Sequence, residues 1–112
     1  MIKVKVTKEK DLIKSISISG HALYDDYGKD IVCSAVSSII TTSINSILAL
    51  DEKGIKYSSR EGNVTITDIK NTKETTTLIE VMLSLLDDLE KDYPDNIKIS
   101  KEDWLWKIYL WN

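Results

Sequence analysis

Two residues of the chain, His21 and Cys33, have side chains that together could hydrolyse an acyl bond. They are the only histidine and the only cysteine in the sequence, and they lie twelve positions apart. A cysteine attacks a carbonyl carbon as its thiolate, and a neighbouring imidazole can accept the proton of the thiol. We therefore interpret Cys33 as a candidate nucleophile and His21 as its general base. The residues alone also allow a plainer interpretation, in which Cys33 is a small buried hydrophobe and His21 is a turn residue.

The hydrophobic pattern around this pair predicts that His21 follows a strand and that Cys33 begins a helix. Residues 2–6 alternate apolar and polar side chains, and residues 12–18 are also a predicted strand, with Ile16 and Ile18 on one face. The short polar segment between the two strands favours a hairpin. From Asp30 onward, apolar residues recur every three or four positions, which predicts a helix of about five turns. With Asp30 as the N-cap, Cys33 lies in the first turn. Unpaired backbone N–H groups there would favour the thiolate and could bind an oxyanion.

A second pair of strands and a second helix complete the fold that positions His21 and Cys33. Residues 55–60 and 64–69 are predicted strands, and Asn71 with Glu74 predicts a capping box at the start of the second helix. Tyr93, Pro94 and Asp95 are expected to end this helix. Its predicted buried stripe consists of Leu78, Ile79, Met82, Leu85, Leu86 and Leu89.

The predicted order of elements is ββαββαβ, which indicates one small α/β (α+β) domain over residues 1–112. A mixed, mostly antiparallel sheet with two helices packed on it would bury both apolar helical stripes. The last segment, residues 97–112, is expected to be extended and carries Trp104 and Trp106 on one face and Trp111 on the other. Apolar surface of this kind often marks a subunit contact, so we predict a homodimer.

Composition narrows the classes of function. The chain has 112 residues with 15 basic and 18 acidic side chains, a net charge of −3 that disfavours direct nucleic-acid binding. Its longest apolar runs span only a few residues, whereas a membrane helix needs about 20. No signal peptide is evident, and one cysteine allows no intrachain disulfide, so a cytoplasmic location is expected. A zinc site needs three or four suitable ligands, and the chain offers only one histidine, one cysteine and the aspartates of the loop. We therefore expect no metal and no cofactor.

The segment from residue 20 to residue 37 carries several residues at a fixed spacing. They are Gly20-His21-Ala22, then Gly28, then Asp30-Ile31-Val32-Cys33, and then Ala35-Val36-Ser37. This motif resembles the signature of the ribosomal-processing cysteine proteases, a bacterial family with a small α/β fold that is commonly dimeric. The length and the order of elements also agree along nearly the whole chain. Leu23 and Ser34 depart from the motif, where the family often has Gly and Ala.

The resemblance implies a function and a set of site residues. These enzymes remove an N-terminal extension from a large-subunit ribosomal protein precursor, and they cut after an aromatic residue. Cys33 then matches the family nucleophile and His21 the family histidine, with Asp30 and Ser37 at positions proposed to support the pair. We expect Asp30 to act mainly through the backbone, as N-cap and loop anchor.

The loop between the second strand and the first helix, from Ala22 to Lys29, is expected to close over a bound peptide. The candidate substrate-binding residues of this segment, including the glycine before it, are Gly20, Ala22, Tyr24, Asp25, Asp26 and Gly28. Ribosomal proteins are basic, so we expect Asp25 and Asp26 to attract the substrate. The alternative function is a non-catalytic ribosome-assembly or protein-binding module of the same fold.

Overall fold

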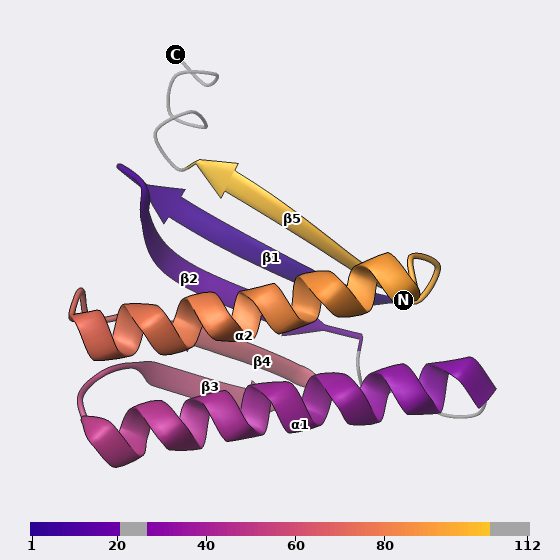
Figure 1. The fold of residues 1–112 in the computed structure, drawn as a ribbon, viewed down its shortest axis with the longest axis horizontal. Helices are drawn as coiled ribbons and strands as arrows, with labels where there is room; N and C mark the ends of the chain where they lie inside the picture. The colour runs from indigo at the N-terminus through magenta and orange to yellow at the C-terminus, as the bar shows by residue number, and fades with distance from the viewer. Residues whose placement is uncertain (21–26, 104–112) are drawn as a thin grey trace.

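The structure is a computed structural model that describes residues 1–20 and 27–103, with only the backbone described for residues 27–30 and 103. The elements follow the order ββαββαβ, which confirms the predicted fold class (Figure 1). They are β1 (Ile2–Glu9), β2 (Leu12–Ser19), α1 (Tyr27–Leu50), β3 (Lys56–Arg60), β4 (Asn63–Thr67), α2 (Lys73–Asp92) and β5 (Ile97–Asp103).

The five strands form one sheet in the order β3-β4-β2-β1-β5. Every neighbouring pair is antiparallel except β1 and β5, which run parallel. Both helices lie on the same side of the sheet and pack against each other (Figure 1). β1 shows the resulting alternation, because Ile2, Val4 and Val6 are buried beneath the helices while Lys3 and Lys5 are exposed on the open side. The domain therefore has two layers, with its core between the sheet and the helices.

Helix α1 is longer and more apolar than we expected from the sequence, in which polar residues interrupt the apolar runs. Its stretch Ile31–Leu50 contains no charged residue, has a mean hydropathy of 1.7, and by length and composition alone could cross a membrane. Val32, Val36 and Ile40 on one side of the helix are buried in the core, as in the core helix of a globular domain. Length and composition alone are weak evidence of a membrane span, and packing in the core accounts for only the 28% of the stretch that is buried.

The start of α2 and its buried stripe differ from the sequence prediction. Thr72, not Asn71, is the N-cap, and its Oγ1 accepts a hydrogen bond of 3.3 Å from the Thr75 backbone N–H. Asn and Thr both cap well, so composition alone could not choose between neighbours. Leu85 is 46% exposed although it was predicted to be buried, because the stripe that faces the core runs through Thr75, Ile79, Met82 and Leu86.

The end of α2 agrees with the sequence prediction. Tyr93 is the C-cap residue, and its backbone N–H donates to the Leu89 carbonyl at 2.9 Å. The chain then returns as β5, which ends at Asp103. Trp104, Trp106 and Trp111 lie outside the described residues, so the prediction of an extended segment is confirmed only as far as Asp103.

Candidate active site

Gly20 ends the strand that leads to His21, and the local geometry requires a glycine there. Its φ is +79°, in the left-handed region that side chains rarely adopt. A Cβ at this position would lie 2.5 Å from the backbone oxygen of Met1, a separation that real structures do not show. Gly20 therefore turns the chain away from β2 while lying against the start of β1. This residue, a predicted part of the motif, has a clear structural reason to be there.

We predict that Gly20→Ala lowers stability by about 1–3 kcal/mol, the usual range for a residue forced into a sparsely populated conformation. The change should also reduce peptidase activity of the folded protein, because it displaces the residue that directly precedes His21 in the chain. Unfolding in urea and cleavage rates measure the two effects. Gly62→Ala is the control, since Gly62 in the β3–β4 turn has a similar φ of +80°. Equal cleavage rates for both folded variants would contradict a positioning role for Gly20.

Cys33 lies at the border between the core and the surface. It is half-buried and packs against the core cluster, next to the fully buried Val32. The following residue, Ser34, is exposed, as expected for a side chain off the apolar stripe. Ser37 follows one helical turn later on the same side as Cys33 and is also exposed. The side chain of Cys33 is thus carried by a helix and is partly exposed.

The start of α1 corrects the predicted environment of Cys33. The chain is already helical at Tyr27, so Asp30 lies within the helix and is not its N-cap. Cys33 follows Tyr27 by six residues, or about 9 Å along the helix axis. Gly28 was interpreted as a loop residue and Asp30 as the cap because the apolar periodicity of the helix begins at Asp30. Gly and Asp also have a low helix propensity. That propensity is a weak preference of about 1 kcal/mol or less per residue, which a 24-residue helix can offset.

This correction changes how the thiol can be activated. The electrostatic effect of a helix start falls off within the first turn, and Cys33 lies beyond that turn. The unpaired N–H groups of the first turn are therefore less able to stabilise a thiolate or an oxyanion at Cys33 than the sequence indicated. A general base becomes the more important source of activation.

The remaining candidate residues are only partly described. His21, Ala22, Tyr24, Asp25 and Asp26 lie outside the described residues. Gly28 and the rest of the stretch Tyr27–Lys29 belong to α1, so the connection between β2 and α1 is shorter than the predicted loop. Within residues 1–20 and 27–103, no three His, Cys, Asp or Glu side chains come close enough to hold a metal ion.

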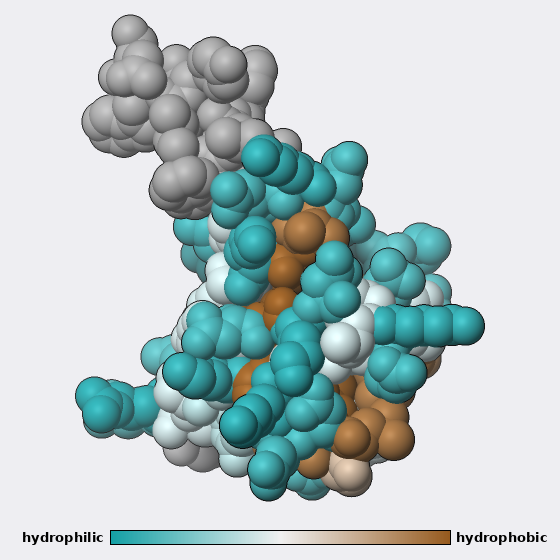
Figure 2. Space-filling view, turned by 90° about the vertical axis from the view of Figure 1, so that its left-hand side faces the viewer, coloured by the Kyte–Doolittle hydropathy of each residue, from teal (hydrophilic) through white to brown (hydrophobic). Residues whose placement is uncertain are grey.

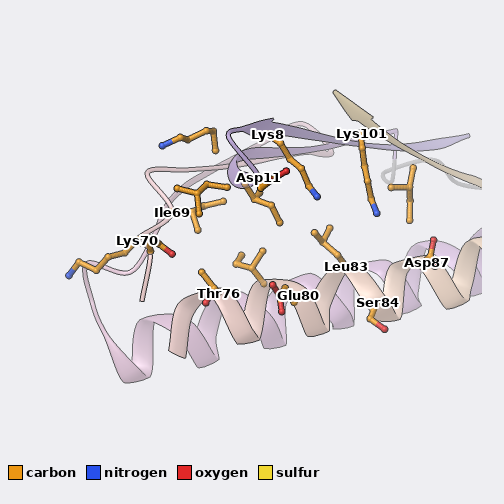
Figure 3. Close-up of a pocket in the computed structure, with 16 residues that line it drawn as sticks. Lys8, Asp11, Ile69, Lys70, Thr76, Glu80, Leu83, Ser84, Asp87 and Lys101 are labelled. Carbon is orange, nitrogen blue, oxygen red and sulfur yellow. The ribbon is translucent and has the colours of Figure 1, made fainter. Parts of the chain in front are cut away.

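The sequence analysis missed one feature, a cavity of about 530 Å³ between α2 and the sheet (Figure 3). Its walls come from β1, β2, β5, α2 and the segment before α2, and none of the lining residues that the structure describes belongs to the motif of residues 20–37. The signal that could have found it is the pair Lys8 and Lys101, which continue the inward-facing positions of their strands. Cys33 is not among the described residues that line this cavity.

The described part of the chain is a two-layer α/β fold that carries a half-buried cysteine on its first helix. The family model described as "Cysteine protease Prp" matches residues 1–98. The chain therefore belongs to the Prp family and is a cysteine protease.

Two curated relatives are described as "Ribosomal processing cysteine protease Prp". The relative from Staphylococcus aureus (strain Mu50 / ATCC 700699) is 30% identical over 104 residues, covering 89% of this chain and 98% of the relative. The relative from Bacillus subtilis (strain 168) is 25% identical over 111 residues, covering 89% and 96%.

Two solved structures of the S. aureus enzyme have the same fold. The structure in complex with a substrate peptide has a TM-score of 0.84 and 26% identity, covering 91% of this chain and all of the other. The structure with a covalently linked product peptide has a TM-score of 0.81 and 27% identity, with the same coverage.

Proposed function

We propose that this protein is an endopeptidase of the bacterial cytoplasm that removes the N-terminal extension of a large-subunit ribosomal protein precursor during ribosome maturation. The observation that carries the proposal is the accessible, half-buried Cys33 on α1 of a chain that belongs to the Prp family. Relatives named as ribosomal processing proteases support the substrate class. The relative solved with a covalently linked product peptide supports a covalent step.

In the proposed reaction, the thiolate of Cys33 attacks the carbonyl carbon of the scissile peptide bond. His21 accepts the thiol proton and gives it to the nitrogen of the leaving amine, so that the C–N bond breaks and a thioester to Cys33 remains. A water molecule, deprotonated by His21, then attacks the thioester and releases the second product. The reaction needs no metal or cofactor.

Asp30 and Ser37 complete the proposed machinery as positioning residues. Because the helix is continuous from Tyr27, Asp30 precedes Cys33 by three positions and Ser37 follows it by four. These are the spacings at which helical residues share one side. With the N-cap role excluded, we assign Asp30 a role through its carboxylate, which can orient the imidazole of His21. Ser37, which is exposed, is placed to tune the surroundings of the thiol.

The segment before α1 is proposed to bind the substrate. Asp25 and Asp26 would attract the basic part of a ribosomal protein, and Tyr24 would contact an aromatic residue before the cut. Ala22 and Gly28 flank these side chains in the sequence. Recognition is thereby directed to a peptide, and direct contact with nucleic acid or a membrane is not expected.

The proposed function is tested by incubating the purified protein with the ribosomal protein precursor from the same genome. Intact mass spectrometry should show one cut that removes the N-terminal extension. The mature ribosomal protein, which lacks the extension, is the control and should remain whole. A precursor of unchanged mass after prolonged incubation would contradict the proposed substrate, while the family membership would stand.

A homodimer is proposed on the composition of α1. Its stretch Ile31–Leu50 has no charged residue, yet Thr41, Asn45 and Leu50 are exposed. Exposed helix faces of soluble proteins usually carry charges, whereas the centres of subunit interfaces are depleted in them. The uncharged outer side of α1 is therefore a suitable subunit interface. This argument for a homodimer does not depend on the tryptophans from which the homodimer was first predicted.

We predict that light scattering gives a dimer mass at micromolar concentration. Thr41→Lys should weaken the dimer about tenfold or more, because an unpaired charge in an interface costs at least the roughly 1.4 kcal/mol that a tenfold change represents. Val81→Lys is the matched control, because Val81 is 49% exposed on α2. A monomer mass for the unmodified protein would refute the homodimer.

A further inference from the structure

The side of the sheet that faces away from the helices, the open face, is polar throughout. It consists of the residues of β1 between Lys3 and Thr7 that point away from the core, together with the residues level with them on the other four strands. These residues are Lys3, Lys5 and Thr7 on β1, Ser15, Ser17 and Ser19 on β2, Lys56, Ser58 and Arg60 on β3, Asn63, Thr65 and Thr67 on β4, and Lys98, Ser100 and Glu102 on β5. A polar face is common where an antiparallel sheet meets water, so polarity alone indicates no partner.

The charges of the open face are one-sided. Five of its residues are cations and only Glu102 is acidic, a net charge of +4, and Glu9 lies beyond the bulge that follows Thr7. Helix α2, on the other side of the sheet, carries six carboxylates and two lysines. Figure 2 shows hydrophobic side chains at the lower right, on the helix side, and hydrophilic side chains at the lower left, where the open face lies. A surface that only solvates a domain usually mixes both signs, so this separation of charge points to an anionic partner.

Three of the five cations have no acidic partner among the described residues. The ammonium group of Lys5 pairs with Glu102 at 3.3 Å, and that of Lys56 pairs with Asp68 at 3.2 Å. The other three, which are exposed, are Lys3, Arg60 and Lys98. The part of the chain that the structure describes places no carboxylate within ion-pair distance of them. Their charges are therefore available to a ligand.

These three cations lie in one row across the sheet, the basic row. The row consists of Lys98, Lys3, Ser19, Asn63 and Arg60, one residue from each strand. Because neighbouring strands are about 4.8 Å apart, the row is about 19 Å long. Lys3 and Lys98 are direct register partners, and like charges in this arrangement repel each other. An anion bound between them would remove this repulsion.

The chemistry of the open face fits a phosphate backbone. Ser17, Thr65 and Ser58 follow one another in the row beside the basic row, and hydroxyls, like lysine and arginine, donate hydrogen bonds to phosphate oxygens. No residue of the open face is aromatic, so no base can stack on it. The same lack of apolar side chains disfavours a membrane, because helices that lie on membranes bury apolar side chains among the lipids.

The net charge of −3 disfavours nucleic-acid binding by the chain as a whole, and recognition of the peptide requires no such contact. The uneven distribution of charge changes this expectation for one face. The acidic α2 repels a polyanion and the open face attracts it, so the approach is oriented. A dimer formed through α1 would leave the open face free, because α1 lies on the other side of the sheet (Figure 1).

We propose that the open face binds the phosphate backbone of RNA through Lys3, Arg60 and Lys98, independently of base sequence. The choice of RNA rests on the proposed function, because a ribosomal protein precursor is assembled together with ribosomal RNA. The basic row itself does not depend on that function. The contact holds the enzyme beside its substrate and leaves the helix side, which carries Cys33, free to meet the peptide.

Fluorescence anisotropy of a labelled RNA duplex, titrated with the full-length protein at several salt concentrations, tests the proposal. We expect a dissociation constant on the order of 10⁻⁵ M at about 50 mM salt. The logarithm of the binding constant should fall with the logarithm of the salt concentration with a slope of about −2 to −3, as three neutralised phosphates require. The triple variant Lys3→Gln, Arg60→Gln, Lys98→Gln should bind at least about tenfold more weakly and lose most of this slope. Lys98→Gln alone should reduce the slope by about one.

The matched control removes the same charge from other parts of the surface. It is the triple variant Lys53→Gln, Lys73→Gln, Lys91→Gln, whose lysines are exposed in the turn after α1 and on α2. Screening by salt makes charges far from the open face count little, so this variant should bind RNA within about twofold of the unmodified protein. Far-UV circular dichroism verifies the fold of every variant.

Three results would overturn the proposal. They are the absence of RNA binding at low salt, an equal loss of binding in the two triple variants, and binding to phosphatidylserine vesicles in place of RNA. Cleavage of the free precursor should be unchanged in the variant of the basic row, and a loss of cleavage would assign these cations to the peptide site instead. Normal cleavage without RNA binding would refute this inference alone, whereas RNA binding without cleavage would refute the proposed function alone.

Discussion

Cys33→Ala should leave the ribosomal protein precursor uncut, with kcat/KM reduced by a factor on the order of 10⁶, as loss of the nucleophile does in other hydrolases. The reason is that the proposed acyl intermediate is a thioester, and Cys33 is the only thiol of the chain. The fold should persist, because alanine has the highest helix propensity and the side chain it replaces is small and half-buried. Intact mass of the precursor over time measures the rate, and circular dichroism verifies the fold.

Ser34→Ala is the matched control for this variant. Ser34 is adjacent to Cys33 on the same helix but exposed, so its loss removes a similar volume without touching the thiol. We expect cleavage close to that of the unmodified enzyme. Undiminished cleavage by purified Cys33→Ala would remove Cys33 from the mechanism.

His21→Ala should lower kcat/KM at neutral pH by about 10²–10⁴, the usual contribution of a general base. Part of this loss should be recovered at alkaline pH, because hydroxide can then take the place of the missing base. A pH profile from 6 to about 9.5 measures both effects. The recovery separates a base from a residue that only supports the fold, because high pH does not restore a lost structural contact.

Two results would count against this role of His21. A His21→Ala variant as active as the unmodified enzyme at neutral pH would exclude it as the base. A variant that is inactive and gains nothing at high pH would assign His21 to substrate binding or structure instead.

Most of the fold could be predicted from periodicity. The alternation from Ile2 to Val6 in β1 is regular because this strand buries one side beneath the helices and exposes the other, and Ile16 and Ile18 of β2 are buried on the same side of the sheet. The errors concern positions where two neighbouring choices differ by little free energy. Thr72 caps α2 in place of Asn71, and α1 is already helical at Tyr27 despite Gly28 and Asp30. Such boundaries depend on tertiary packing, which outweighs differences of about 1 kcal/mol in local preference.

The candidate site was found through a spaced motif, and the cavity was not. Cys33 is where the motif indicates, on the first helix and at the edge of the core. The cavity joins residues such as Lys8, Leu83 and Lys101, which are far apart in the sequence and carry no common pattern. Only the sheet order, with β5 next to β1, brings them together. The roles of His21, Asp30 and Ser37 and the domain limits 1–112 stay predictions.

The central claim is that Cys33 is the nucleophile that cleaves the precursor. It is tested most directly by measuring the alkylation of Cys33 and the cleavage of the precursor in the same samples. The enzyme is treated with iodoacetamide at near-neutral pH for increasing times, and intact mass spectrometry then gives both the alkylated fraction and the remaining cleavage rate. Because the chain has a single cysteine, the addition of one carbamidomethyl group to a thiol reports on Cys33 alone. We predict rapid alkylation, slowed by a substrate peptide, with cleavage lost in proportion to the alkylated fraction. A fully alkylated enzyme that still cuts the precursor, or a Cys33 that stays unreactive while cleavage proceeds, would contradict the account.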